Sequence, residues 1–250
     1  MNRLMPHSES SGAGAAPQPT PLTPSASSEL ERPLQPADER SAPRVDRGPD
    51  ALQQARDFAA AGETAAAITT LRALIAREPR HARAHAFLAE LLEKRGDTEG
   101  ALGELARALD VAPDDIVILC QRALLLTTKG RYDLAEADLR SAVRVDATSA
   151  DVQLQLGVLY CKRARWREAI EPLRAAVASA PDRVAAHYYL GDAYNSIDEL
   201  PSALSAYQAA ATLDPTHHRA LQAIGVVLDR LRRPNDAALA YQRAREAQRK

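Results

Sequence analysis

The sequence predicts an all-α protein, a solenoid of tandem helix pairs preceded by a tail. Only 4% of its 250 residues are aromatic, whereas about one residue in five is alanine. Alanine is the strongest helix former, while strands favour β-branched and aromatic side chains. Glycine, alanine and proline also recur every 34 residues, a period that is typical of stacked helical repeats.

The first 47 residues form the tail. They hold eight of the sixteen prolines, many serines and few large apolar side chains. Proline excludes a helix from Ala16–Pro24, and so little apolar surface cannot offset the entropy of ordering the chain. We expect a disordered Pro/Ser-rich tail over residues 1–47, with no apolar signal-peptide core in Met1–Ser10.

Prolines and alanines recur at a regular spacing in the rest of the chain. Pro79, Pro113, Pro181 and Pro215 are separated by 34, 68 and 34 residues, and Ala147 stands at the skipped place. Alanine occupies one place in every unit: Ala67, Ala101, Ala135, Ala169, Ala203 and Ala237. We therefore predict a solenoid over residues 48–250 with six repeats, at 48–81, 82–115, 116–149, 150–183, 184–217 and 218–250.

Each repeat is predicted to hold two helices. In the fourth repeat, apolar side chains follow helical spacing over residues 150–163 and again over 166–178, and Pro181 ends the second helix. Pro172 falls inside that second helix, where we expect a local bend. Two further glycine series keep the 34-residue period, one beside the loop (Gly62, Gly96, Gly130) and one inside the first helix (Gly157, Gly191, Gly225).

The second glycine series has a steric interpretation. Gly157, Gly191 and Gly225 lie where the first helix of a repeat crosses the second, and Ala89 and Ala123 occupy the same place in earlier repeats. A side chain larger than a methyl group would hold the two helices apart.

These residues together resemble a known repeat family. Repeat 184–217 carries the series Leu190-Gly191, Tyr194, Ala203, Tyr207, Ala210 and Pro215. This pattern is similar to the tetratricopeptide repeat, from which repeat 116–149 departs by using Arg122-Ala123 and Ala147. The resemblance implies a right-handed superhelix whose first helices line a concave groove that holds a peptide or a partner helix.

The resemblance also assigns the residues of the groove. In the family, the second, fifth, ninth, twelfth and thirteenth places of each repeat face inward. The expected partner-binding groove comprises Val117, Cys120, Leu124, Leu154, Val158, Cys161, Tyr188, Asp192, Asn195 and Asp229. An apolar centre with a polar rim is typical of a partner site, unless a loop or the tail covers it.

One specialised groove of this family is not matched. Members that bind chaperone C-termini carry a two-carboxylate clamp of lysine, asparagine and arginine. At the corresponding places this chain has Leu52 with Arg56, Phe87, and Val117 with Gln121. We therefore do not expect a chaperone co-factor.

The sequence contains no recognisable catalytic or metal-binding pattern. His81 and His85 are the one histidine pair with i, i+4 spacing, and they straddle a predicted turn. Cys120 and Cys161 lie 41 residues apart and lack a nearby base. We expect a cytoplasmic protein without enzymatic activity, cofactor, metal ion or small-molecule substrate.

The charges argue against nucleic acid and anionic membrane as the main partners, since 33 acidic and 32 basic residues give a net charge of −1. Repeat 218–250 nevertheless has eight basic and three acidic residues, which would allow peripheral membrane contact. The expected function is a protein-interaction scaffold or adaptor. Two alternatives are an accessory or regulatory subunit of an enzyme or of a membrane-associated secretion or assembly apparatus, and an RNA-associated protein. Arginine outnumbers lysine 28 to 4, which favours a bacterial, GC-rich source.

Overall fold

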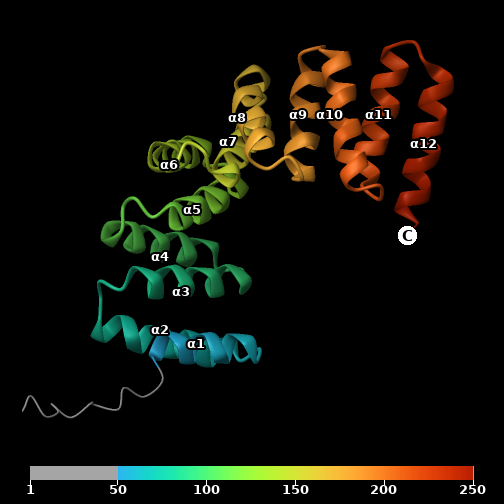
Figure 1. Ribbon diagram of the computed structural model, residues 1–250. Coiled ribbons are helices and arrows are strands. Elements are labelled where there is room, and N and C mark those ends of the chain that lie inside the picture. The colour runs from blue at the N-terminus through green and yellow to red at the C-terminus, as the bar shows by residue number, and fades with distance from the viewer. Residues whose placement is uncertain (1–49, 250) are drawn as a thin grey trace, which may run out of the picture. The chain divides into compact units, whose positions relative to one another are not determined.

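The computed structural model describes residues 50–249, and the part drawn in colour in Figure 1 is helical throughout. Twelve α-helices and no strand occur within these residues, which confirms the all-α prediction. Residues 50–249 belong to one compact unit. The predicted tail at residues 1–47 lies outside the described residues.

The helices follow the repeat period, two to each 34 residues. Each helix contacts the next one along the chain, and α7 also contacts α5 and α9, the first helices of the neighbouring repeats. The pairs are α1 (Ala51–Ala60) and α2 (Thr64–Arg77), α3 (Ala82–Lys94) and α4 (Thr98–Val111), α5 (Ile116–Thr128) and α6 (Tyr132–Val145), α7 (Ala150–Lys162) and α8 (Trp166–Ser179), α9 (Val184–Ser196) and α10 (Leu200–Leu213), and α11 (His218–Arg230) and α12 (Pro234–Gln248).

Prolines and capping side chains set the helix boundaries. Pro79 follows the end of α2 at Arg77, and Pro181 follows the end of α8 at Ser179, as the spacing predicts. Asp115 caps α5 by accepting hydrogen bonds from the backbone amides of its first turn. Pro172 lies inside α8, which continues through it as a single helix.

Four of the five histidines within residues 50–249 have structural roles at the repeat boundaries. His81 and His217 cap α3 and α11, each accepting a hydrogen bond through Nδ1 from the amide three residues later. His85 Nε2 lies 2.9 Å from the carbonyl oxygen of Pro79, and His187 Nε2 lies 2.8 Å from that of Pro181. In the fourth repeat a glutamine replaces histidine, and Gln153 Nε2 donates to the carbonyl of Ala147 at 2.8 Å. This contact fixes the start of one repeat to the end of the preceding one.

The crossing of paired helices leaves no room for a side chain at the second glycine series. A Cβ atom on Gly157 would lie 2.5 Å from Leu173 Cγ, and one on Gly191 would lie 2.5 Å from Tyr207 Cδ1. Both distances are far shorter than a van der Waals contact. The structure confirms the steric interpretation and tightens it, because at these two places even a methyl group clashes.

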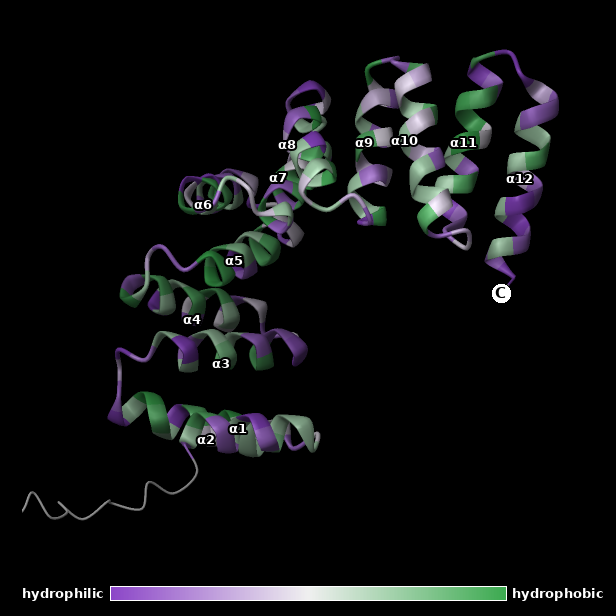
Figure 2. Cartoon of the chain, viewed as in Figure 1, coloured by the Kyte–Doolittle hydropathy of each residue, from purple (hydrophilic) through white to green (hydrophobic). Residues whose placement is uncertain are grey.

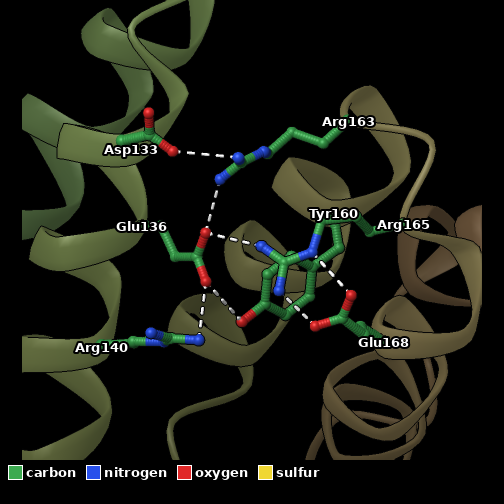
Figure 3. Close-up of polar contacts among 7 residues, drawn as sticks. All are labelled: Asp133, Glu136, Arg140, Tyr160, Arg163, Arg165 and Glu168. Atoms are coloured by element: carbon green, nitrogen blue, oxygen red, sulfur yellow. Dashed lines mark hydrogen bonds and ion pairs between the residues drawn. The ribbon is translucent and has the colours of Figure 1, made fainter.

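A cluster of charged side chains joins the third and fourth repeats (Figure 3). The buried Glu136 carboxylate of α6 accepts hydrogen bonds from Arg163 at 2.6 Å and from Arg165 at 2.7 Å. Arg140 lies 2.7 Å from the same carboxylate, and the Tyr160 hydroxyl donates to it at 3.2 Å. Because three guanidinium groups and a phenol surround one carboxylate, its loss of water is compensated.

Candidate functional site

A pocket of about 360 Å³ opens between α5 and α7, the first helices of the third and fourth repeats. Its walls are mainly apolar and carboxamide side chains, with one hydroxyl and one carboxylate: Ile116, Val117, Cys120, Gln121, Leu124, Ser149, Asp151, Val152 and Gln155. Val117 is 66% exposed and Leu124 is 53% exposed, which is unusual for large apolar side chains in the middle of a solenoid. The structure therefore brings together three of the predicted groove residues: Val117, Cys120 and Leu124.

The amino-acid sequence of α5 explains this exposure. Its apolar residues extend around most of the helix, as the green colouring in Figure 2 shows. Ile118, Leu119 and Leu125 pack into the core, which leaves Val117 and Leu124 on a face that the chain's own packing does not use. A helix that is apolar all round is normally buried all round. The exposed face of α5 is thus an apolar surface that no other part of residues 50–249 covers.

Two glutamines border this surface at equivalent places, one repeat apart. The side-chain oxygens of Gln121 on α5 and Gln155 on α7 are buried, and neither accepts a hydrogen bond from any of the described residues. Buried polar atoms are almost always paired in folded proteins. The two carboxamides are therefore the polar groups of this pocket whose hydrogen bonding is incomplete.

The remaining apolar positions of the predicted groove lie deeper. Leu154 and Val158 on α7 are half-buried, whereas Cys161 is buried at 7% exposure and belongs to the core. Cys161 thus contributes no accessible surface, contrary to the expectation from its place in the repeat. Burial raises the pKa of the Cys161 thiol to about 12 and that of Cys120 to about 11. Both thiols stay protonated at neutral pH, so neither is an activated nucleophile.

An aromatic and acidic cluster lies on the fifth repeat. The Tyr207 hydroxyl of α10 donates to Asp192 Oδ1 of α9 at 2.6 Å, and the Tyr188 ring lies 5.8 Å from that of Tyr207. The ring of His217 lies 5.1 Å from Tyr188 on another side. Burial raises the pKa of Asp192, opposed by the hydrogen bonds from Tyr207 and Tyr188. Within residues 50–249, no lysine or arginine forms an ion pair with this carboxylate.

The other two predicted polar residues have partners within the chain. Arg230 of α11 donates to the Asn195 side chain, and also to its backbone oxygen at 3.1 Å. The Tyr241 hydroxyl of α12 donates to Asp229 at 2.8 Å. Asn195 and Asp229 therefore tie neighbouring helices together, and a partner would have to compete for them.

A second pocket, of about 370 Å³, lies beside the first, and Val117 is its one lining residue among those named for the predicted groove. It is lined by Arg56, Arg83, Ala86, Phe87, Glu90, Asp115, Val117, Ile118 and Gln121. Val117 and Gln121 line both pockets, so the two form one continuous surface from α1 to α7. Arg56 and Arg83 stand at the ninth and second places of their repeats, which the family pattern turns inward, but only the structure shows that both line one pocket.

Residues 50–249 contain no group of three or more histidine, cysteine, aspartate or glutamate side chains placed to hold a metal ion. None of the helices described is both long enough and apolar enough to cross a membrane.

Solved structures of other proteins share this fold. MamA from Desulfovibrio magneticus RS-1 superposes with a TM-score of 0.63 at 26% identity, covering 67% of this chain and 95% of that one. PilF from Pseudomonas aeruginosa gives a TM-score of 0.67 at 20% identity, over 76% of this chain and 86% of PilF. YrrB, described as a TPR protein with an unusual peptide-binding site, gives 0.61 at 22% identity, over 71% of this chain and 92% of YrrB. The last two likenesses concern the fold alone.

Curated relatives match over shorter stretches. The human Protein SGT1 homolog is 31% identical over 75 residues, which cover 30% of this chain and 20% of the human protein. ETO1-like protein 1 of Arabidopsis thaliana is 28% identical over 149 residues, 57% of this chain and 16% of that protein. The chain thus spans about a fifth or less of these relatives' own length.

Sequence profiles of the family cover most of the helical region. Tetratricopeptide repeat profiles match residues 52–116 and 154–218, and a further one matches residues 116–149. These matches extend over more than half of the chain and agree with the helix pairs of the structure. The chain belongs to the tetratricopeptide repeat family.

Proposed function

We propose that this protein is an interaction scaffold or adaptor that binds a peptide or a partner helix on the surface formed by α3, α5 and α7. The observation that carries the proposal is the exposure of Val117 and Leu124 beside a pocket with two unpaired carboxamide oxygens. An apolar patch with incomplete hydrogen bonding is stabilised when a ligand brings both apolar area and polar groups.

Apolar anchors would supply most of the binding energy. Burying a leucine or valine side chain contributes about 1.5–3 kcal/mol, and a few central anchors usually dominate an interface. Leu124 and Val158 are the proposed anchors, because they lie on the facing helices α5 and α7. The carboxamides of Gln121 and Gln155 would add directional bonds to a peptide backbone.

The fifth repeat would set the charge preference at one end of the groove. Asp192 is a partly buried carboxylate beside the Tyr188 ring, and repeat 184–217 contains neither lysine nor arginine. A cationic or amide group of the partner would therefore be favoured near Asp192, with the ring adding a cation–π contact.

The comparisons support a protein-interaction role in general terms. YrrB is described as having a peptide-binding site, and it shares the fold of this chain. An accessory subunit of an enzyme or of a secretion apparatus would use the same surface, because such a subunit also acts by holding a partner.

The test is a double substitution on the proposed anchors, Leu124→Glu with Val158→Glu. Two carboxylates in an apolar interface leave buried charges unpaired, so capture of the natural partner should fall at least a hundredfold, about 3 kcal/mol. The measurement is affinity isolation of the partner, followed by titration with the purified proteins. Circular dichroism should show that the variant remains helical.

A matched control places the same charges on exposed apolar side chains elsewhere. Leu134 on α6 is 58% exposed and Leu239 on α12 is 61% exposed. Leu134→Glu with Leu239→Glu should leave capture unchanged. Undiminished binding by a folded Leu124→Glu, Val158→Glu variant would overturn the groove proposal.

A further inference from the structure

We infer that the pocket between α3 and α5, with Arg56 of α1 at its edge, binds an acidic side chain of the partner peptide. This inference rests on the proposed function, since the pocket shares Val117 and Gln121 with the apolar surface. It adds an anionic specificity that the repeat pattern does not predict.

Within residues 50–249, the two arginines of this pocket have no ion-pair partner. Arg56 and Arg83 are both exposed. A guanidinium group presents five donors in a planar fork that matches a carboxylate. Two such groups on one pocket wall favour the binding of a negatively charged group.

The negative charges of the same pocket already have partners. The Glu90 carboxylate lies 2.7 Å from Lys94 Nζ on the same helix. Asp115 caps α5, accepting from the amides of Val117 at 3.0 Å and Ile118 at 3.2 Å. Glu90 is thus paired with a lysine, and the amide hydrogen bonds of Asp115 use Oδ1 alone. With Lys94 counted, three cationic side chains stand against two carboxylates, so the pocket keeps a net positive charge for a ligand.

The rest of the wall specifies what accompanies the acidic group. Ala86, Phe87 and Val117 form an apolar surface beside the arginines. A peptide with Asp or Glu next to a large apolar residue would fill both parts. Because Val117 and Gln121 belong to both pockets, the same peptide would continue onto Leu124, with its acidic residue toward the first two repeats.

Selection from a random peptide library tests this preference without a known partner. Twelve-residue peptides, fused through their C-termini to a phage coat protein, are selected on three forms of the full chain. These are the native protein, an Arg56→Gln, Arg83→Gln variant, and an Arg72→Gln, Arg77→Gln control that removes the same charge from α2. The fusion leaves no free C-terminus, so only side-chain carboxylates can be selected.

The expected result separates the two proposals. Peptides selected on the native protein and on the control should be enriched in Asp or Glu beside a large apolar residue. The Arg56→Gln, Arg83→Gln variant should lose the acidic enrichment and keep the apolar one. Apolar enrichment without acidic enrichment on the native protein would overturn the acidic preference and leave the groove standing, whereas no enrichment of any kind would overturn both.

A selected peptide then gives the size of the effect. The amidated peptide should bind the native protein about fivefold to tenfold more tightly than its Glu→Gln analogue, and added salt should shrink the difference. The free-acid form should gain little over the amidated one. Equal binding of the Glu and Gln peptides, or a larger gain from the free C-terminus, would overturn the assignment to an acidic side chain.

Discussion

Glycine stands at different places in the first three repeats and in the last three. The first three carry it in the turn between the paired helices, and the last three carry it where those helices cross. The turn between paired helices needs a left-handed residue, with φ of 81°, 83° and 73° at Gly62, Gly96 and Gly130. In the later repeats Ala164, Asp198 and Arg232 occupy this place, with φ of 55°, 68° and 59°. Non-glycine residues in this region are strained by about 1 kcal/mol or more, so the later turns are held by the surrounding packing.

The helix crossing shows the reverse pattern. Alanine occupies the crossing place in the first three repeats and glycine in the last three, at Ala55, Ala89, Ala123, Gly157, Gly191 and Gly225. The facing side chain of the second helix is leucine in the first four repeats and tyrosine in the last two, Tyr207 and Tyr241. Glycine thus makes room for a larger neighbour at Gly191 and Gly225, whereas Gly157 faces Leu173.

This difference bears on function as well as on packing. The two tyrosines reach across the glycine crossing, and their hydroxyls donate to Asp192 and Asp229 on the first helices. Leucine, at the equivalent place in the earlier repeats, has no hydroxyl to donate. The polar end of the candidate groove is therefore built where a tyrosine faces a glycine crossing, whereas the apolar pocket lies between α5, which has an alanine crossing, and α7, which has a glycine crossing with leucine opposite.

Removing the Glu136 carboxylate should have the largest effect on stability, because it joins the two groups of repeats (Figure 3). Glu136→Ala leaves Arg163 and Arg165 without their shared partner. We expect a loss of about 3 kcal/mol, the low end for breaking a buried ion pair, since Arg163 keeps its ion pair with Asp133 and Arg165 keeps its ion pair with Glu168. Urea unfolding followed by Trp166 fluorescence reports this region.

The control for that change is Glu171→Ala, which removes an 81% exposed partner of Arg174. Exposed pairs of this kind contribute about 0.5 kcal/mol or less. If the two variants unfold at the same urea concentration, the charged cluster does not hold the third and fourth repeats together.

Gly157→Leu should have the next largest effect. The new side chain would collide with Leu173, and overpacking of this kind costs about 1–3 kcal/mol or more. For a folded unit of this size, each kcal/mol lowers Tm by about 2–4 °C. Gly103, on the exposed side of α4, has no atom within 4 Å of an added Cβ, so Gly103→Ala should instead raise Tm slightly. An unchanged Tm for Gly157→Leu would contradict the crossing register.

Exchanging the turn residues should give the smallest effect, with opposite signs in the two regions. Gly130→Ala introduces left-handed strain and should lower the free energy of unfolding by about 1 kcal/mol. Ala164→Gly relieves strain but frees the unfolded chain, so a gain of about 0.5 kcal/mol is expected. Denaturant titrations of both variants measure the difference; changes of the same sign would show that turn strain does not distinguish the two regions.

The repeat period made most of the fold predictable from the sequence. The second helix of a repeat ends two residues before each of Pro79, Pro113, Pro181 and Pro215. The places where alanine or glycine recurs every 34 residues mark where the paired helices cross. These features are local, because backbone geometry and close packing restrict which residue can stand at each place. Burial of individual groove residues was less predictable: Cys161 faces the core although its place in the repeat indicates the groove.

By itself, the sequence determined the helix pairs, their period and the apolar face of α5. Only the tertiary structure decided which polar groups are already paired. Arg56 and Arg83 meet at one pocket although they lie 27 residues apart, and Asp192 and Asp229 are bound by tyrosines of the following helix. A residue's type states which bonds it can make, but its partners depend on the distances that packing sets between helices. The specificity of the groove therefore becomes visible only in three dimensions.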